Sequence, residues 1–107
     1  MPKQHNYYVY MLTNPKKIVL YTGMTNNLIR RLQEHTDGYM KQDFQKFTAR
    51  YHCYHLVYFE HHKYVLNAIA REKEIKGWRR SKKDALINEV NPEWKFLEYG
   101  LGFPFTK

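Results

Sequence analysis

The amino-acid sequence predicts an α+β domain in which a small β-sheet packs against helices. The expected order of elements is strand, strand, helix, strand, helix, helix, and the first two strands lie close enough in the chain to form an antiparallel hairpin. The length of 107 residues fits one domain, residues 1–107, with one modest core. Hydrophobic residues at 43% and charged residues at 26% are typical of a folded protein.

Aromatic and β-branched segments predict the three strands. Residues 6–12 (NYYVYML) form the first expected strand, and residues 14–17 (NPKK) form a turn. Residues 18–22 (IVLYT) form the second, which Gly23 is expected to end. Residues 51–60 (YHCYHLVYFE) predict the third strand.

The first expected helix follows the hairpin. Asn26 or Asn27 is placed to cap a helix through residues 28–35 (LIRRLQEH), and residues 37–38 (Asp-Gly) are expected to close it. The polar stretch 39–50 predicts no definite element.

Two further helices are expected in the C-terminal half. Residues 64–79 predict a helix with an apolar face. Ser81 and Asp84 have the spacing of a capping box that opens the next helix, which residues 91–92 (Asn-Pro) end. Residues 93–99 predict a last short helix. The apolar face of the first of these helices consists of Val65, Ala68, Ile69 and Ile75.

The charge and cysteine content limit the function classes. A formal net charge of +8 and a pI of about 9.6 attract polyanions, nucleic acid first among them. Binding to an anionic membrane surface would need a basic helix with a bulky apolar face, and the polar composition argues against such a helix. Cys53 is the single cysteine, so neither an internal disulfide nor a CxxC zinc site is expected. With no apolar signal segment or membrane-length span, a cytoplasmic location is expected.

Glu72 is the carboxylate that the helical pattern singles out. It falls on the apolar face with Ala68 and Ile75, whereas Glu74 falls on the opposite face. A carboxylate in an apolar stripe is costly unless a positive partner meets it, and the partner is either an arginine or a metal ion. Without further evidence these two alternatives are about equal.

An anion site is expected on the first helix and its neighbouring strands. Arg31 and His35 lie four residues apart and share one helix face, which suits a phosphate. Tyr10 lies on the first strand and Tyr21 on the second, and in a hairpin their hydroxyls can reach a common cleft. Gly23 lets the backbone approach a substrate closely.

These residues resemble the paired motif of the GIY-YIG nuclease superfamily. The motif lies at YVY (8–10) and YTG (21–23), and its tyrosines, Tyr10 and Tyr21, are eleven positions apart. Tyr8 stands where the family name has glycine, and Thr22 where it has isoleucine. The resemblance continues in order over residues 7–92, and AREKEIKGWRRSKK resembles the stand-alone small bacterial branch. Its further matches are Arg31, His35, Ala68, Glu72 and Asn91.

The resemblance implies a fold and a mechanism. The fold is a three-stranded antiparallel sheet flanked by helices, and the activity is a divalent-metal-dependent endonuclease. Glu72 would hold one Mg²⁺ or Mn²⁺, and Arg31 would stabilise charge on the phosphate. Tyr10 or Tyr21 would orient or deprotonate water, with His35 positioning a tyrosine hydroxyl. Gly23 and Asn91 would support the site.

A basic strip is expected to bind backbone phosphates without reading sequence. The substrate would be DNA, cut with low sequence specificity or selected by its structure in repair or recombination, and a protein partner could supply specificity. Two alternatives stay open: a non-catalytic nucleic-acid-binding module with the nuclease fold, and an adaptor for an acidic protein. A solvated face is the plainer interpretation of the strip alone. The phosphate-binding set is Arg30, Lys73, Lys76, Arg79, Arg80, Lys82 and Lys83.

Overall fold

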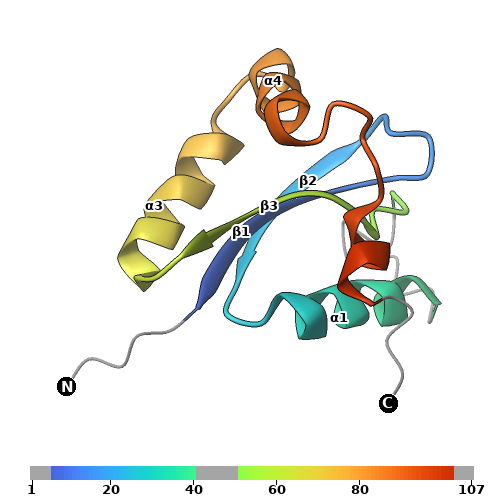
Figure 1. The fold of residues 1–107 in the computed structure, drawn as a ribbon, viewed down its shortest axis with the longest axis horizontal. Helices are drawn as coiled ribbons and strands as arrows, with labels where there is room; N and C mark the ends of the chain where they lie inside the picture. Colours follow the sequence, from blue (N-terminus) through green and yellow to red (C-terminus); the bar gives the residue numbers. More distant parts are fainter. Residues whose placement is uncertain (1–5, 41–50, 103–107) are drawn as a thin grey trace.

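A three-stranded antiparallel sheet forms the centre of the protein in a computed structural model that describes residues 6–40 and 51–102 (Figure 1). The strands are β1 (Tyr7–Thr13), β2 (Leu20–Thr25) and β3 (His55–His62), in the spatial order β2-β1-β3. Both pairings are antiparallel. The hairpin, the sheet and the order of elements predicted from the sequence are confirmed.

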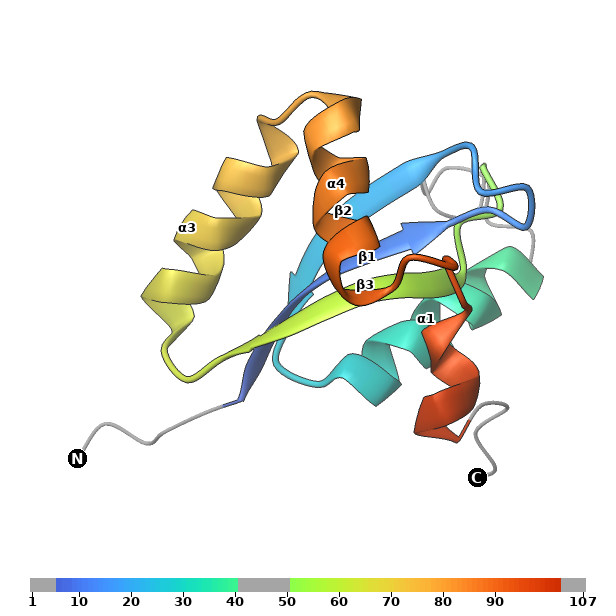
Figure 2. The ribbon, with the colours of Figure 1, turned by 45° about the horizontal axis from the view of Figure 1, so that its top comes forward.

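Helices cover both faces of the sheet (Figures 1 and 2). One face packs against α1 (Leu28–Met40) and the short 3-10 helix η1 (Leu97–Leu101). The other face packs against α3 (Val65–Lys76) and α4 (Arg80–Val90). No helix in the described ranges is long and apolar enough to cross a membrane.

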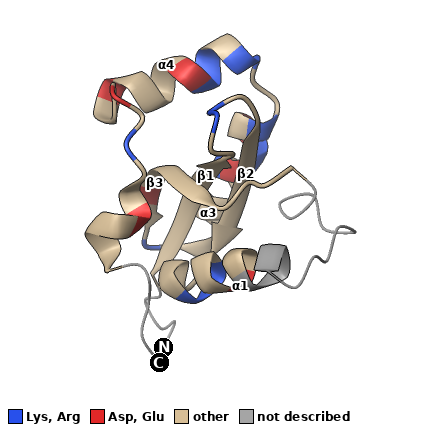
Figure 3. Ribbon diagram, turned by 90° about the vertical axis from the view of Figure 1, so that its right-hand side faces the viewer, with Lys and Arg blue, Asp and Glu red and all other residues tan. Residues whose placement is uncertain are grey.

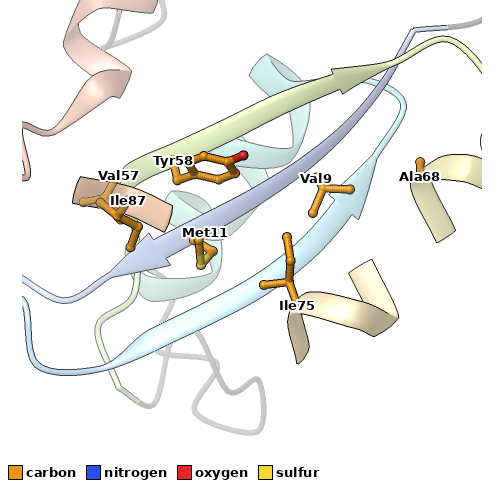
Figure 4. Packing of buried hydrophobic residues seen from close by; sticks show 7 residues of the cluster. All are labelled: Val9, Met11, Val57, Tyr58, Ala68, Ile75 and Ile87. Carbon is orange, nitrogen blue, oxygen red and sulfur yellow. The ribbon is translucent and has the colours of Figure 1, made fainter. Parts of the chain in front are cut away.

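The central strand β1 is buried on both faces, which follows from its composition. Val9 and Met11 point into the core beneath α3 and α4, where Figure 4 shows them with Ile75 and Ile87. Alternate residues of a strand face opposite sides, so Tyr10 and its neighbour Leu12 point toward α1. Tyr10 therefore lies in a packed layer and cannot move freely.

Several predicted boundaries of β2, α1 and β3 are wrong. Gly23 does not end β2 but lies inside it, paired with Tyr10. Helix α1 does not close at residues 37–38 but continues to Met40. β3 begins at His55, because residues 51–52 form a turn. Most of the segment 39–50 lies outside the described residues.

The predicted capping box is also wrong. Arg79, not a serine, is the N-cap of α4, and Ser81 lies within the helix. The Asp84 carboxylate instead accepts a hydrogen bond from Arg80 Nε at 2.8 Å, one turn earlier. The preceding helix α3 ends at Lys76, earlier than expected, and the last short helix is η1 rather than residues 93–99.

Candidate active site

Four residues predicted from the sequence converge on the α1 face of the sheet. The Tyr10 hydroxyl lies 3.0 Å from His35 Nε2, and Arg31 Nε donates to the same hydroxyl at 3.4 Å. The ring centroid of Tyr21 lies 6.3 Å from that of Tyr10 and 5.5 Å from that of His35. The cluster thus combines residues from β1, β2 and α1, and we call these four residues the tyrosine cluster.

Helix α1 begins where it can deliver Arg31 and His35 to this cluster. Asn27 Oδ1 accepts a hydrogen bond from the Arg30 backbone N–H at 3.1 Å, as expected of a cap. Leu28 and Leu32 are buried against the sheet. Since residues one turn apart share a face, burying the leucines fixes the direction in which the cluster's side chains project.

Gly23 is the residue that makes room for the Tyr10 hydroxyl. It lies opposite Tyr10 in the β1–β2 pairing. A Cβ atom on Gly23 would lie 2.5 Å from the Tyr10 hydroxyl oxygen and 2.9 Å from a ring carbon of Tyr21. Any side chain here would collide with both tyrosines, so the glycine is required by close packing rather than by an unusual backbone angle.

Burial raises the pKa of Tyr10 well above its ordinary value. The hydrogen bond from Arg31 opposes this shift, and the charges of Tyr21 and Glu72 add to it. Tyr10 is also fully shielded from solvent, whereas Tyr21 is half-buried. Tyr10 is therefore held as a neutral phenol, and Tyr21 is the tyrosine of the cluster that solvent can reach.

Arg31 remains cationic and has an acidic neighbour that the sequence analysis missed. Partial burial lowers the pKa of Arg31, but hydrogen bonds to Tyr10 and Tyr21 outweigh it, so the pKa is raised overall. Arg31 Nη1 also donates to Glu34 Oε2 at 3.4 Å, and Glu34 Oε1 lies 3.5 Å from Arg30 Nε. The spacing of three and four residues was the available signal.

Glu72 lies on α3 with a lysine partner. Its Oε2 is 3.5 Å from Lys76 Nζ, and its side chain is 22% exposed. Among the described residues no arginine pairs with it, the alternative that the sequence left open, because Arg71 binds Glu60 and Glu74. Glu72 adds to the raised pKa of Tyr10 less than burial or Tyr21 does, so the carboxylate lies within electrostatic range of that phenol. Glu72 is thus accessible and not sealed in a structural arginine pair.

Asn91 is buried at the end of α4, where its side chain makes three hydrogen bonds to backbone. Its Nδ2 donates to the Val57 carbonyl at 2.9 Å and to the Lys95 carbonyl at 3.0 Å. Its Oδ1 accepts from the Lys95 N–H at 2.9 Å. These bonds tie the loop after α4 to β3, and they go to backbone rather than to the side chains of the tyrosine cluster.

The basic strip runs from α3 to the first turn of α4, whose blue segments are visible in Figure 3. Arg80 donates to the Ile18 carbonyl just before β2, which holds this end of the strip against the edge strand that carries Tyr21. Lys82 Nζ lies 4.4 Å from the Trp78 ring centroid. Arg30 is exposed on α1 and donates to Asn26 Oδ1 at 3.2 Å.

Comparison with known proteins identifies relatives along most of the chain. Residues 6–85 match the family described as the GIY-YIG catalytic domain. A UPF0213 protein of Bacillus pumilus is 34% identical over 85% of this chain and 88% of its own length. One from Syntrophus aciditrophicus is 38% identical over 80% of this chain and 93% of its own length.

A solved structure supports the same assignment. The solution NMR structure of a UPF0213 protein from Bacillus halodurans superposes with a TM-score of 0.51 and 29% sequence identity. The match covers 80% of this chain and 86% of that one. The family match over residues 6–85 includes every residue of the tyrosine cluster.

Proposed function

Because this chain belongs to the GIY-YIG catalytic domain family, a nuclease superfamily, we propose that it is a divalent-metal-dependent endonuclease that hydrolyses phosphodiester bonds in DNA. One observation carries the proposal: Arg31 and His35 both contact the Tyr10 hydroxyl beside the Tyr21 ring. A cation and two phenols held together at an edge strand form a site for a phosphate and its attacking water.

The residues of the tyrosine cluster have different proposed roles, which follow from how exposed each side chain is. Tyr10, buried and neutral, positions the Arg31 guanidinium and the His35 ring rather than taking a proton. Tyr21 can meet solvent and orients the attacking water. Arg31 stabilises the negative charge that develops on the phosphate oxygens as the water adds. We therefore propose Tyr21, rather than Tyr10, for the water-directing role, because Tyr21 is the more exposed of the two.

The donor set suits a hard divalent ion with few protein ligands. GIY-YIG nucleases generally use divalent metal ions. In the part of the chain that the structure describes, no three His, Cys, Asp or Glu residues gather as a metal site. We propose Glu72, a partly exposed carboxylate, as the ligand of Mg²⁺ or Mn²⁺, since Mg²⁺ keeps several waters and uses one or two carboxylates. When bound, the ion would polarise the phosphate and support the leaving oxygen.

The reaction that these groups support is hydrolysis. The oxygen of water bonds to phosphorus while the bond from phosphorus to one nucleoside oxygen breaks. Water loses one proton toward solvent near Tyr21, and the departing oxygen gains one. Arg31 stays protonated throughout, because its hydrogen bonds raise its pKa. The protein therefore contributes positioning and charge stabilisation rather than a covalent intermediate.

The basic strip supports low sequence specificity. Lys73, Lys76 and Arg79 are exposed on α3 and the loop that follows it. Exposed lysines and arginines can contact backbone phosphates, and such contacts carry no direct sequence information. Structure-selective cleavage during DNA repair or recombination fits these properties, and so does specificity supplied by a partner protein.

The direct test is to incubate the protein with plasmid, branched and single-stranded DNA in Mn²⁺ or in EDTA. We expect cleavage with Mn²⁺ and none with EDTA. Binding that weakens as salt rises, without cleavage of any substrate, would instead support a non-catalytic module. Equal binding to DNA and to an acidic polypeptide would support the adaptor.

A further inference from the structure

A cavity of about 270 Å³ lies beside the tyrosine cluster, and the mechanism above does not use it. Its walls include Tyr8 and Phe59 from the sheet and three asparagines, Asn6, Asn26 and Asn27. Its volume is just below the range of about 300–1,000 Å³ that is typical of pockets for drug-sized ligands. It therefore has room for one small planar group.

The aromatic side of the cavity faces the same way as the tyrosine cluster. The β1–β3 pairing places Phe59 opposite Tyr10 and His61 opposite Tyr8, so these side chains share the α1 face. The Tyr8 ring contacts Phe59 edge-on at 6.4 Å and His61 at 5.4 Å between centroids. Phe59 is 37% exposed although it is apolar. Exposed aromatic rings are the usual stacking partners of unpaired bases.

The asparagines of the cavity offer hydrogen-bond donors. Asn26 Oδ1 accepts from Arg30 NH2 and Asn27 Oδ1 from the Arg30 N–H, at 3.2 and 3.1 Å. Asn6 Oδ1 lies 2.7 Å from His61 Nε2. With the three amide oxygens bonded inside the protein, the amide NH₂ groups are the donors that these side chains can offer a ligand. Ring nitrogens and carbonyl oxygens at base edges are matching acceptors.

The cavity and the tyrosine cluster are continuous along two elements. Tyr8 precedes Tyr10 by two residues on one face of β1, a rise of about 7 Å. Asn27 lies one helical turn before Arg31, whose N–H donates to the Asn27 carbonyl at 3.0 Å. A phosphate at Arg31 would thus have the cavity next to it along the path of a nucleic-acid strand.

We propose that this cavity binds one unpaired nucleobase adjacent to the phosphate at Arg31, so that the substrate is single-stranded or branched nucleic acid rather than continuous duplex. A base within a duplex would have to leave its stack to enter the cavity, which costs energy that an unpaired base does not spend. The inference rests on the proposed function for the position of the phosphate.

The test measures binding in EDTA, so that it does not depend on cleavage. A labelled single-stranded oligonucleotide, a forked duplex and a blunt duplex are titrated with wild type and with Tyr8→Leu and Phe59→Leu. We expect about tenfold weaker binding of the single-stranded and forked DNA, the effect of losing one base–aromatic stack. Binding of the blunt duplex should stay unchanged. Tyr64→Leu is the matched control, since Tyr64 is exposed at the start of α3 and does not line the cavity.

Asn26→Ala keeps the test informative if the aromatic variants do not fold, because Asn26 is exposed and its replacement should leave the fold intact. It should weaken single-stranded binding by about threefold, the effect of one hydrogen bond. Wild-type affinity of folded Phe59→Leu and Asn26→Ala for single-stranded DNA would overturn the proposal, as would an equal loss on blunt duplex. If no DNA is cut in Mn²⁺ but these variants still lose single-stranded binding, the proposed function fails and the base site stands.

Discussion

At the residue scale, Tyr10 organises the candidate site. Its hydroxyl meets His35 and Arg31, and its ring packs in the core beside Leu12 and Leu32. Burial raises the pKa of this phenol, so it can donate a hydrogen bond at neutral pH but does not readily release its proton. Such a phenol is suited to positioning its hydrogen-bond partners rather than to transferring a proton.

Gly23→Ala tests the space around Tyr10. The new Cβ would lie 2.5 Å from the Tyr10 hydroxyl, so the ring must leave the position in which its hydroxyl contacts His35 and Arg31. We expect a loss of stability of about 1–3 kcal/mol from overpacking, together with loss of cleavage. Chemical denaturation measures the stability, and an assay with plasmid, branched and single-stranded DNA in Mn²⁺ measures the cleavage.

Gly100→Ala serves as the control, since a Cβ there meets nothing within 4 Å. It should keep both stability and activity. If Gly23→Ala cleaved DNA as fast as Gly100→Ala, the position of the Tyr10 hydroxyl would not matter for activity.

At the element scale, Glu60 ties β3 to α3 through contacts that no local pattern predicts. Tyr58 donates to its carboxylate at 2.5 Å, His62 Nε2 donates at 2.5 Å, and Arg71 Nε donates at 3.1 Å. Burial alone raises the pKa of Glu60, but these three hydrogen bonds outweigh it and lower the pKa overall. This network lies beside Glu72, on the helix that carries it.

The lowered pKa of Glu60 predicts a pH dependence of stability. A carboxyl group whose pKa is lower in the folded state stabilises the fold above its unfolded pKa, near 4.5, and this contribution is lost as pH falls through the folded pKa. We expect Glu60→Gln to be less stable than wild type at neutral pH, with the difference shrinking below about pH 4.5. Thermal unfolding from pH 3 to pH 7 measures it.

Glu93→Gln is the comparison for this experiment, because Glu93 is 72% exposed in a surface pair with Lys95. Its unfolding curve should follow wild type at every pH. A stability difference for Glu60→Gln that stayed constant across the range would show that the charge of Glu60 plays no part.

The same element scale shows where sequence reasoning succeeds and where it stops. The convergence of Tyr10, Tyr21 and Arg31 was predictable, because hairpin pairing and helical periodicity bring residues at fixed spacings together. The Glu60–Arg71 pair joins residues eleven apart on different elements, and Glu98 binds His55 from 43 residues away. Such contacts depend on how the elements approach one another, which spacing does not encode. The boundary errors at Gly23 and Ser81 arose because packing overrode local propensity.

At the scale of the whole molecule, the two faces of the sheet have different roles. The α1 face holds the tyrosine cluster and the cavity, whereas the α3–α4 face supplies Glu72 and most of the basic strip. The edge strand β2 joins them: it carries Tyr21, and Arg80 binds the backbone just before it. A nucleic-acid strand following this edge would meet both sets of residues.

The basic strip predicts a salt-dependent affinity for DNA. Each lysine that neutralises a phosphate contributes about one to the slope of log K against log salt concentration. The variant with Lys73→Ala and Lys82→Ala should therefore lower the slope by about two. Titrations between 50 and 200 mM salt, about the range in which phosphate contacts dominate affinity, measure it.

Lys95→Ala removes an exposed lysine that already pairs with Glu93 and lies outside the strip. It should leave the slope as in wild type. Equal slopes for all three proteins would mean that the strip is a solvated face and not a phosphate-binding surface.

The most direct test of the account is cleavage of plasmid, branched and single-stranded DNA in Mn²⁺ by Glu72→Gln and Glu74→Gln. Glu72 forms only a partly exposed pair with Lys76, so its replacement should change the stability of the fold little. Glu74 is the matched control, because it also pairs with a basic residue on the same helix, Arg71. We predict that the folded Glu72→Gln protein does not cleave, and that Glu74→Gln cleaves as wild type does. Wild-type cleavage by Glu72→Gln would contradict the central claim that this carboxylate, acting with the tyrosine cluster, makes the protein a metal-dependent nuclease.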